Sequence, residues 1–204
     1  MIVIGLTGSI GMGKSTVAAM LQNLGVPVHE SDAEVHALLA PGGGAKSAVA
    51  AAFPIFKFPS IYEKKTKAIK RKALGDIVFS DDEKRKKLEG ILHPLVREAQ
   101  NKFILKNKKM GQAMIALDIP LLFETGGDEF VDVTIVVTAP FHVQQKRVLE
   151  RPGMDEKKFH AILDRQMPDE EKRARADYVL QTGLGRAETM RDLKKILESI
   201  RSAK

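Results

Sequence analysis

The chain has 204 residues, of which 44% are hydrophobic and 29% charged; its formal net charge is +7 and it contains no cysteine. This composition fits one sizeable globular core and excludes wholesale disorder, a disulfide scaffold, a thiol nucleophile and a zinc site with Cys ligands. No stretch reaches the ~18 uncharged apolar residues of a membrane span, and the N-terminal sequence MIVIGLTGS lacks the basic region of a signal peptide. We therefore expect a cytoplasmic location and no membrane partner.

The positive net charge has two interpretations. One is a solvated basic surface without a partner, and the other is a site for an anionic ligand such as a nucleotide, a phosphate ester or a nucleic acid. Aromatic residues make up only 5% of the chain, with no Trp and two Tyr, which disfavours a surface that stacks on bases. We therefore expect a small-molecule partner and no nucleic acid.

The first 40 residues predict two strands and two helices. Residues 2–6 are apolar and β-branched, as in a buried strand. Four apolar side chains of the segment 14–24 share one helical face, and Gly25 stands where a glycine commonly ends a helix. Residues 26–29 are a second short strand, after which Asp32 can cap a helix that runs to about residue 40.

The middle of the chain is predicted to be mostly helical. A PGGG sequence marks a hinge, and the helical character then extends over residues 45–109. The SDDE sequence at 80–83 predicts a capping box that begins a helix. The His-Pro pair at 93–94 is expected to end it, because the residue before proline disfavours the α region, and a further helix is expected over 94–108.

The last third returns to alternating strands and helices. This alternation indicates βαβ units and a parallel sheet with helices on both faces. The expected strands are 113–117, 133–137 and 179–180, and the expected helices are 141–151, 155–167, 169–175 and 186–201.

A phosphate-binding motif follows the first strand directly. Residues 8–15, GSIGMGKS, match G-x-x-x-x-G-K-[ST], with a predicted strand before and a helix after. Glycines let the backbone wrap closely, so that N–H groups and the positive helix end cradle phosphate oxygens. Lys14 can reach the β and γ phosphates of ATP, and the Ser15 hydroxyl can ligate Mg²⁺. The expected ATP-binding residues are Gly11, Met12, Gly13, Lys14, Ser15 and Thr16.

Together, motif and alternation predict an α/β P-loop NTPase, with a parallel sheet flanked by helices, a helical substrate-binding lobe and a helical lid. The nucleotide-binding core is assigned to residues 1–40, 110–140 and 176–204. The lobe is assigned to 41–109 and the lid to 141–175.

A P-loop occurs in kinases, GTPases and motors, so the catalytic residues outside the loop must distinguish these classes. In a parallel sheet, ligands lie beyond the carboxyl ends of the strands, and Asp32 and Asp118 each follow such an end. A carboxylate at Asp32 can orient an acceptor hydroxyl and take its proton, or it can simply cap a helix. Asp118 resembles a Walker B acid that holds Mg²⁺ through water, or is a turn residue at a strand end.

Other P-loop classes fit less well. GTPases carry a glycine three residues after the Walker B aspartate, whereas this chain has Leu121 there. The sequence NKKM at 107–110 also lacks the acidic residue of a guanine-binding motif. A motor normally needs a longer chain. Two alternatives stay open: another small P-loop kinase acting on a nucleoside monophosphate or related alcohol, and a nucleotide-dependent module that binds nucleic acid.

Several motifs, in this order, resemble the dephospho-CoA kinase family over about residues 1–185. Members phosphorylate the ribose 3′-hydroxyl of dephospho-CoA with ATP, the last step of coenzyme A synthesis. The resemblance implies a CoA-binding lobe, an ATP lid and, as cofactors, ATP and Mg²⁺. The motifs are GLTGSIGMGKST at 5–16, LGVPVHESDAEVH at 24–36, LHP at 92–94, IPLLFE at 119–124 and ADYV at 176–179.

The same resemblance implies roles for individual residues. It makes Asp32 the catalytic base, whereas His93 has a second interpretation as a buried, hydrogen-bonded packing residue. The basic run at 57–72 is interpreted as a solvated helix face, apart from Arg71. The residues expected on the acceptor side are Asp32, Arg71, His93, Pro94, Leu121, Leu122 and Glu124.

Two features of the lid region complete the prediction. Arg147 and Arg151 are four apart on a predicted helix and share a face. A lid arginine can neutralise charge on the transferring phosphoryl group, and we assign this catalytic role to Arg147, with solvated lid charges as the alternative. The family's usual Asn after ADYV is absent, and Thr182 stands in that loop. We expect a monomer or a weak homo-oligomer.

Overall fold

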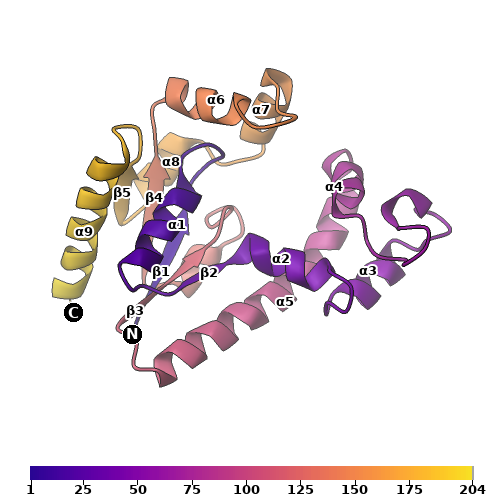
Figure 1. Ribbon diagram of the computed structural model, residues 1–204, viewed down its shortest axis with the longest axis horizontal. Helices are drawn as coiled ribbons and strands as arrows, with labels where there is room; N and C mark the ends of the chain where they lie inside the picture. The colour runs from indigo at the N-terminus through magenta and orange to yellow at the C-terminus, as the bar shows by residue number, and fades with distance from the viewer. Residues whose placement is uncertain (204) are drawn as a thin grey trace. The chain divides into compact units, whose positions relative to one another are not determined.

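The computed structural model describes residues 1–203, which form two compact units (Figure 1). The sheet unit comprises Met1–His29 and the chain from Lys106 onward, and the helical unit comprises Glu30–Leu105. The helical unit thus begins at Glu30, ahead of the start at residue 41 expected for the lobe. Its assignment as a CoA-binding lobe stays a prediction.

A five-stranded sheet has the strand order β2-β3-β1-β4-β5. β1 pairs in parallel with β3 and with β4, and β4 pairs in parallel with β5. Parallel neighbours need crossover connections, which helices provide in an α/β fold. The predicted parallel sheet is therefore confirmed, with small shifts at the strand ends. The strands are β1 (Ile2–Thr7), β2 (Val28–Glu30), β3 (Met114–Asp118), β4 (Val133–Thr138) and β5 (Tyr178–Gln181).

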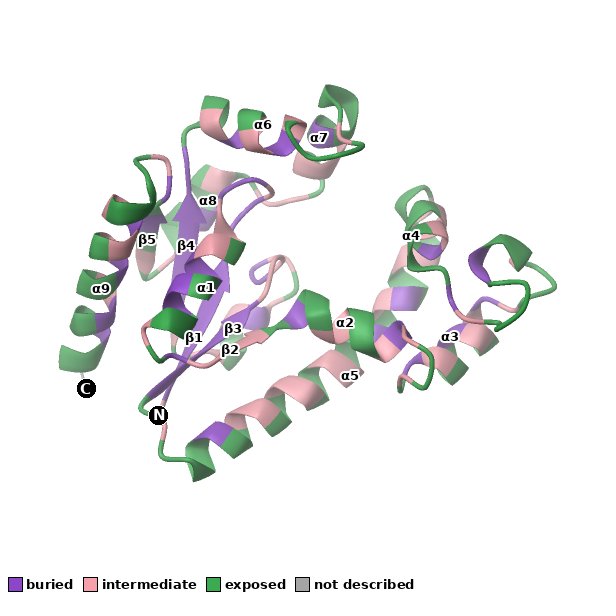
Figure 2. Ribbon diagram, viewed as in Figure 1, coloured by how far each residue is buried: buried purple, intermediate pink, exposed green. Residues whose placement is uncertain are grey.

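Helices cover both faces of this sheet. On one face α1 and α9 bury the side chains of Ile4 and Leu6 in a continuous apolar cluster, so the strands are buried along most of their length (Figure 2). On the other face α8 packs on β4, and the Arg175 guanidinium lies 4.7 Å above the Phe123 ring. The helices are α1 (Lys14–Asn23), α6 (Phe141–Leu149), α7 (Glu156–Leu163), α8 (Asp169–Arg175), α9 (Arg186–Ser202) and the short 3₁₀ helix η2 (Gly127–Phe130).

The helical unit has its own apolar core. Phe53, Ile61 and Leu74 are almost completely buried there, and the Tyr62 hydroxyl donates a 2.7 Å hydrogen bond to the Phe53 carbonyl. Its elements are α2 (Ser31–Leu39), α3 (Lys46–Ala52), the 3₁₀ helix η1 (Pro59–Ile61), α4 (Arg71–Phe79) and most of α5 (Asp82–Lys109), which continues into the sheet unit.

The predicted break at the His-Pro pair is wrong. α5 is one continuous helix with Pro94 inside it, although an internal proline costs ~3 kcal/mol through a lost N–H and a clash with the carbonyl four residues earlier. That carbonyl belongs to Gly90, a residue without a side chain. Apolar side chains of α5 before the proline, Leu88 and Leu92, are buried in the core of the unit. Tertiary packing therefore outweighs the local preference.

The predicted capping box at the start of α5 is also wrong in detail. Asp81, and not Ser80, accepts a 3.0 Å hydrogen bond from the Lys84 amide. The Ser80 hydroxyl instead donates to carbonyls at the end of α4, at 3.0 Å from Ile77 O. Asp81 thus caps the start of α5, whereas Ser80 bonds to the end of α4.

Among the residues that the structure describes, none of the helices combines the length and the apolar character that a membrane span requires.

Candidate active site

The loop between β1 and α1 has the backbone shape of a phosphate-binding nest. Gly11 and Gly13 have φ of +78° and +91°, a left-handed region that favours glycine. Gly8 lies so close to β4 that a Cβ there would come 2.4 Å from a Val137 methyl group and 2.7 Å from its carbonyl oxygen. Sterics therefore demand glycine at all three motif positions.

The start of α1 is open to an anion. Gly13 precedes the helix, and among the described residues no side chain caps this end. The first N–H groups of a helix lack acceptors within the helix and carry a partial positive charge. The loop and the helix end can therefore bind phosphate oxygens.

Lys14 forms an ion pair with Asp118 at the carboxyl end of β3. Their side chains are only 15% and 8% exposed. A hydrogen bond from Ile119 N to Leu6 O, at 2.9 Å, ties the chain after β3 to the end of β1. The ion pair thus brings the carboxylate expected to act as a Walker B acid directly to the P-loop lysine.

Two glutamines that the sequence analysis missed hold the peptide groups of Ile10. Gln144 of α6 donates through Nε2 to the Ile10 carbonyl at 2.8 Å, and the Ile10 amide donates to Gln166 Oε1 at 3.0 Å. Gln144 is buried, with 3% exposure. A single buried polar residue on a helix is recognised as functional only when the fold is known, because its spacing matches no motif.

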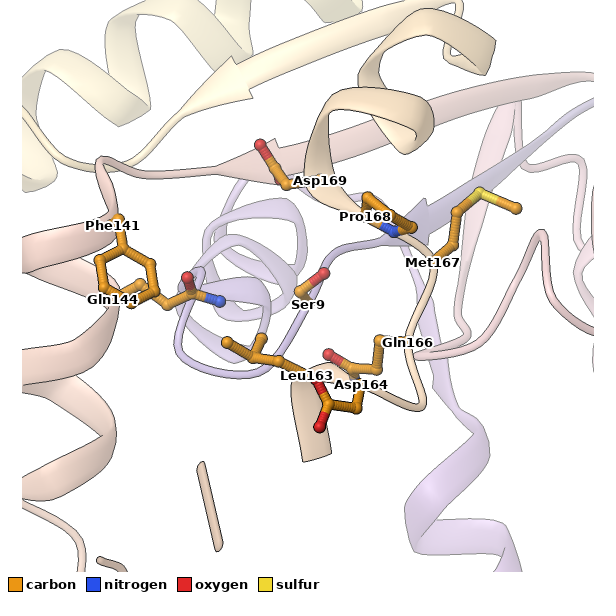
Figure 3. Close-up of a pocket in the computed structure, with 9 residues that line it drawn as sticks. All are labelled: Ser9, Phe141, Gln144, Leu163, Asp164, Gln166, Met167, Pro168 and Asp169. Atoms are coloured by element: carbon orange, nitrogen blue, oxygen red, sulfur yellow. The ribbon is translucent and has the colours of Figure 1, made fainter. Parts of the chain in front are cut away.

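These glutamines belong to a pocket beside the P-loop (Figure 3). Its volume is about 440 Å³. Ser9 of the P-loop lines one wall, and the remaining lining comes from α6 and from residues 163–169, which run from the end of α7 to the start of α8. The lining residues are Ser9, Phe141, Gln144, Leu163, Asp164, Gln166, Met167, Pro168 and Asp169.

Arg147 of α6 lies against the P-loop. Its guanidinium donates to Thr182 Oγ1 at 2.9 Å, to the Thr182 carbonyl at 2.7 Å and to the Gly11 carbonyl at 3.4 Å. The alternative of a solvated charge is therefore wrong for this residue, whereas Arg151 is exposed.

Three predicted acceptor residues lie on the segment after β3. Leu122 is completely buried, and a Cβ on Gly5 would touch it at 3.0 Å. Glu124 Oε1 accepts from the Met167 amide at 2.9 Å and pairs with the fully buried Lys172 at 2.8 Å. Leu121 is partly exposed. Leu122 therefore packs the segment after β3 against β1, and Glu124 ties this segment to Met167 and Lys172.

The remaining predicted residues lie in the helical unit. Asp32 is exposed in the first turn of α2, which begins one residue earlier, so the helix-cap interpretation of Asp32 is wrong. Arg71 is the exposed first residue of α4. His93 and Pro94 are exposed on α5, so the interpretation of His93 as a buried packing residue is also wrong.

Comparison with known proteins identifies what this arrangement is similar to. The family model for dephospho-CoA kinase matches residues 2–187. Dephospho-CoA kinase of Novosphingobium aromaticivorans is 48% identical over 199 residues, covering 98% of this chain and 94% of that protein. The crystal structure of TT1252 from Thermus thermophilus is similar with a TM-score of 0.80 and 36% identity, covering 97% of each chain. Dephospho-CoA kinase from Campylobacter jejuni follows with a TM-score of 0.69 and 29% identity, covering 98% of each.

The close approach of Gly8 to β4 generates a prediction about P-loop strain. Gly8→Ala places a Cβ against Val137, so we expect a loss of about 1–3 kcal/mol in the free energy of unfolding together with weakened ATP binding. Urea unfolding and ATP titration measure the two effects.

Gly75→Ala is the matched control, because a Cβ at this position in α4 meets open space. It should stabilise the protein by about 0.5–1 kcal/mol through helix propensity and leave ATP binding unchanged. A Gly8→Ala variant as stable as the wild type, with normal ATP affinity, would contradict the steric argument.

Proposed function

The chain belongs to the dephospho-CoA kinase family, and we propose that it transfers the γ-phosphoryl group of ATP to the ribose 3′-hydroxyl of dephospho-CoA, forming CoA and ADP. The observation that carries the proposal is the phosphate nest at residues 8–15, with Lys14 and Asp118 paired beside it, in a chain that matches the family over residues 2–187.

Binding of ATP begins with the phosphates in this proposal. The N–H groups of the loop and of the start of α1 donate to the β and γ phosphate oxygens, with Gly11 through Thr16 as the contact residues. The Lys14 ammonium exchanges its ion pair with Asp118 for the phosphates. This exchange replaces one buried charge pair by another, so the lysine never lies unpaired in a poorly solvated position.

Mg²⁺ fits the donors at this position. Ser15 is an exposed hydroxyl at the start of α1, and Asp118 supplies a carboxylate at the end of β3. A hydroxyl and a carboxylate suit Mg²⁺, which proteins bind through few side chains together with water and substrate phosphates. Ser15 and Asp118 would hold the ion, which would supply positive charge against the charge that develops on the phosphates.

Asp32 is the proposed general base. Its carboxylate is exposed and lies on a short helix directly after β2. As the 3′-oxygen of the acceptor bonds to the γ-phosphorus and the bond to the β-phosphate oxygen breaks, the hydroxyl proton passes to Asp32 and ADP leaves. Water would compete as an acceptor, so closure of the lid segment is part of the proposal.

Arg147 is the proposed electrostatic stabiliser. Its guanidinium already contacts the Gly11 carbonyl in the loop, and positive charge there opposes the charge that spreads over the phosphoryl oxygens during transfer.

For the acceptor we propose contacts with the exposed Arg71, His93 and Pro94 of the helical unit and with Leu121. Leu122 and Glu124 contribute by holding the segment on which Leu121 lies. Arg71 suits the diphosphate of the acceptor, because a guanidinium binds phosphate oxygens in a bidentate manner.

The acceptor is tested directly by incubating the enzyme with ATP, Mg²⁺ and dephospho-CoA as sole acceptor. We expect release of ADP and a product whose mass is that of CoA. A parallel panel contains adenylate and cytidylate. Transfer to either of these, with none to dephospho-CoA, would replace the proposal by that of a nucleoside monophosphate kinase.

Asp32→Asn tests the base. It keeps the shape of the side chain and removes the proton acceptor, so kcat should fall by about 10²–10⁴-fold while the KM for ATP changes little. Asp192→Asn on α9 is the control, because its carboxylate is exposed and pairs with Lys195 on the same helix. Near-normal turnover of Asp32→Asn would remove this residue from the chemical step.

A further inference from the structure

The residue after β5, Thr182, is a polar group that the proposed mechanism does not use. It is buried, with 5% exposure. Its amide donates to the Thr138 carbonyl at 2.8 Å, which continues the pairing of β5 with β4. The backbone at this position is therefore fixed to the sheet, and its side chain extends from a rigid element.

The Thr182 hydroxyl connects the P-loop to the lid. It donates to the Met12 carbonyl at 2.6 Å and accepts from the Arg147 guanidinium at 2.9 Å. A Cβ on Gly13 would lie 3.0 Å from this hydroxyl, so the hydroxyl also lies against the loop backbone. One oxygen thus donates to a buried carbonyl and accepts from a partly buried guanidinium.

The bond to the Met12 carbonyl has a consequence for phosphate binding. A trans peptide group is planar, so the Met12 carbonyl and the Gly13 N–H point in opposite directions. A donor that holds the carbonyl from outside the loop therefore aims the N–H of Gly13 away from Thr182. Gln144 acts on the preceding part of the loop in the same way, because its bond to the Ile10 carbonyl orients the N–H of Gly11.

We propose that Thr182 is a positioning residue for ATP binding, whose hydroxyl orients the Met12–Gly13 peptide group and links it to Arg147. This inference rests on the proposed function, in which the loop binds the phosphates of ATP. A threonine hydroxyl suits the role because it donates and accepts at the same time.

Thr182→Val removes the hydroxyl and keeps the branched shape. The buried Met12 carbonyl then lacks its donor, and Arg147 loses its side-chain acceptor while it keeps the Thr182 and Gly11 carbonyls. Because leaving buried polar groups unsatisfied weakens a site substantially, we expect the dissociation constant and the KM for ATP to rise by about tenfold to a hundredfold. The KM for dephospho-CoA should stay close to that of the wild type. Thr182→Ser keeps the hydroxyl and should restore ATP affinity to within about threefold of the wild type.

ATP binding is measured by calorimetric titration of Mg·ATP without any acceptor. The result is then independent of the acceptor's identity, so failure of the proposed acceptor and failure of this inference are distinguishable. Steady-state kinetics supply the second readout. Partial unfolding lowers the amount of active enzyme and hence the apparent kcat, but it leaves both KM values unchanged.

Three results would overturn the inference. The first is wild-type ATP affinity in a folded Thr182→Val variant, and the second is a Thr182→Ser variant that binds as weakly as Thr182→Val. Thr182→Ala serves as a second variant if Thr182→Val does not fold. The third result is that both hydroxyl-free variants unfold while Thr182→Ser folds, because the hydroxyl then acts on folding and the positioning role is wrong.

Discussion

The orientation of the P-loop peptide groups is the constraint on which the rest of the site depends. A nest binds phosphate only if several N–H groups converge, and converging N–H groups force the matching carbonyls outward. In this chain outward carbonyls have donors: Gln144 for Ile10, Thr182 for Met12 and Arg147 for Gly11. The glycines permit the loop shape, and these donors select it.

The same contacts join the P-loop to the segment 141–175, which we predict to be a lid. Gln144 and Arg147 are three residues apart on α6, so both side chains lie on the face that meets the loop. Gln166 reaches the loop from the far end of the segment, and Glu124 holds the neighbouring amide of Met167. The shape of the loop therefore depends on direct hydrogen bonds from α6 and from Gln166.

Sequence alone predicts the parts of this protein that depend on local patterns. The strands, the P-loop and its flanking elements follow from hydrophobic runs and glycine spacing, and most of the helices were placed within a few residues. The break at Pro94 was wrong because a local preference of ~3 kcal/mol was outweighed by packing of α5 in the helical unit. Ser80 was mistaken for the cap of α5 because three polar residues in succession all suit that role, and only the structure distinguishes Asp81.

In the site too, residues within a local motif are predicted from the sequence, and residues that act through tertiary contacts are not. Lys14, Ser15 and Asp118 lie in recognisable contexts, whereas Gln144, Gln166 and Thr182 are single polar residues without a spacing rule. Gln144 and Thr182 bond to backbone carbonyls and Gln166 to a backbone amide, and each partner is more than a hundred residues away in the sequence. No short stretch of sequence therefore contains both members of a pair. Arg71 and His93 are predicted from the resemblance to the family alone, whereas Asp32 is also predicted from its place after a strand end. The structure adds that these three side chains are exposed.

The central claim is that the loop at residues 8–15 binds the phosphates of ATP through its amides and Lys14. Titration of Mg·ATP into Lys14→Met measures this directly, with Lys195→Met on the exposed face of α9 as control. Loss of a charged hydrogen-bond donor should weaken ATP binding by about tenfold to a hundredfold and reduce turnover to background, while the control behaves as wild type. Unchanged ATP affinity in a folded Lys14→Met variant would contradict the account.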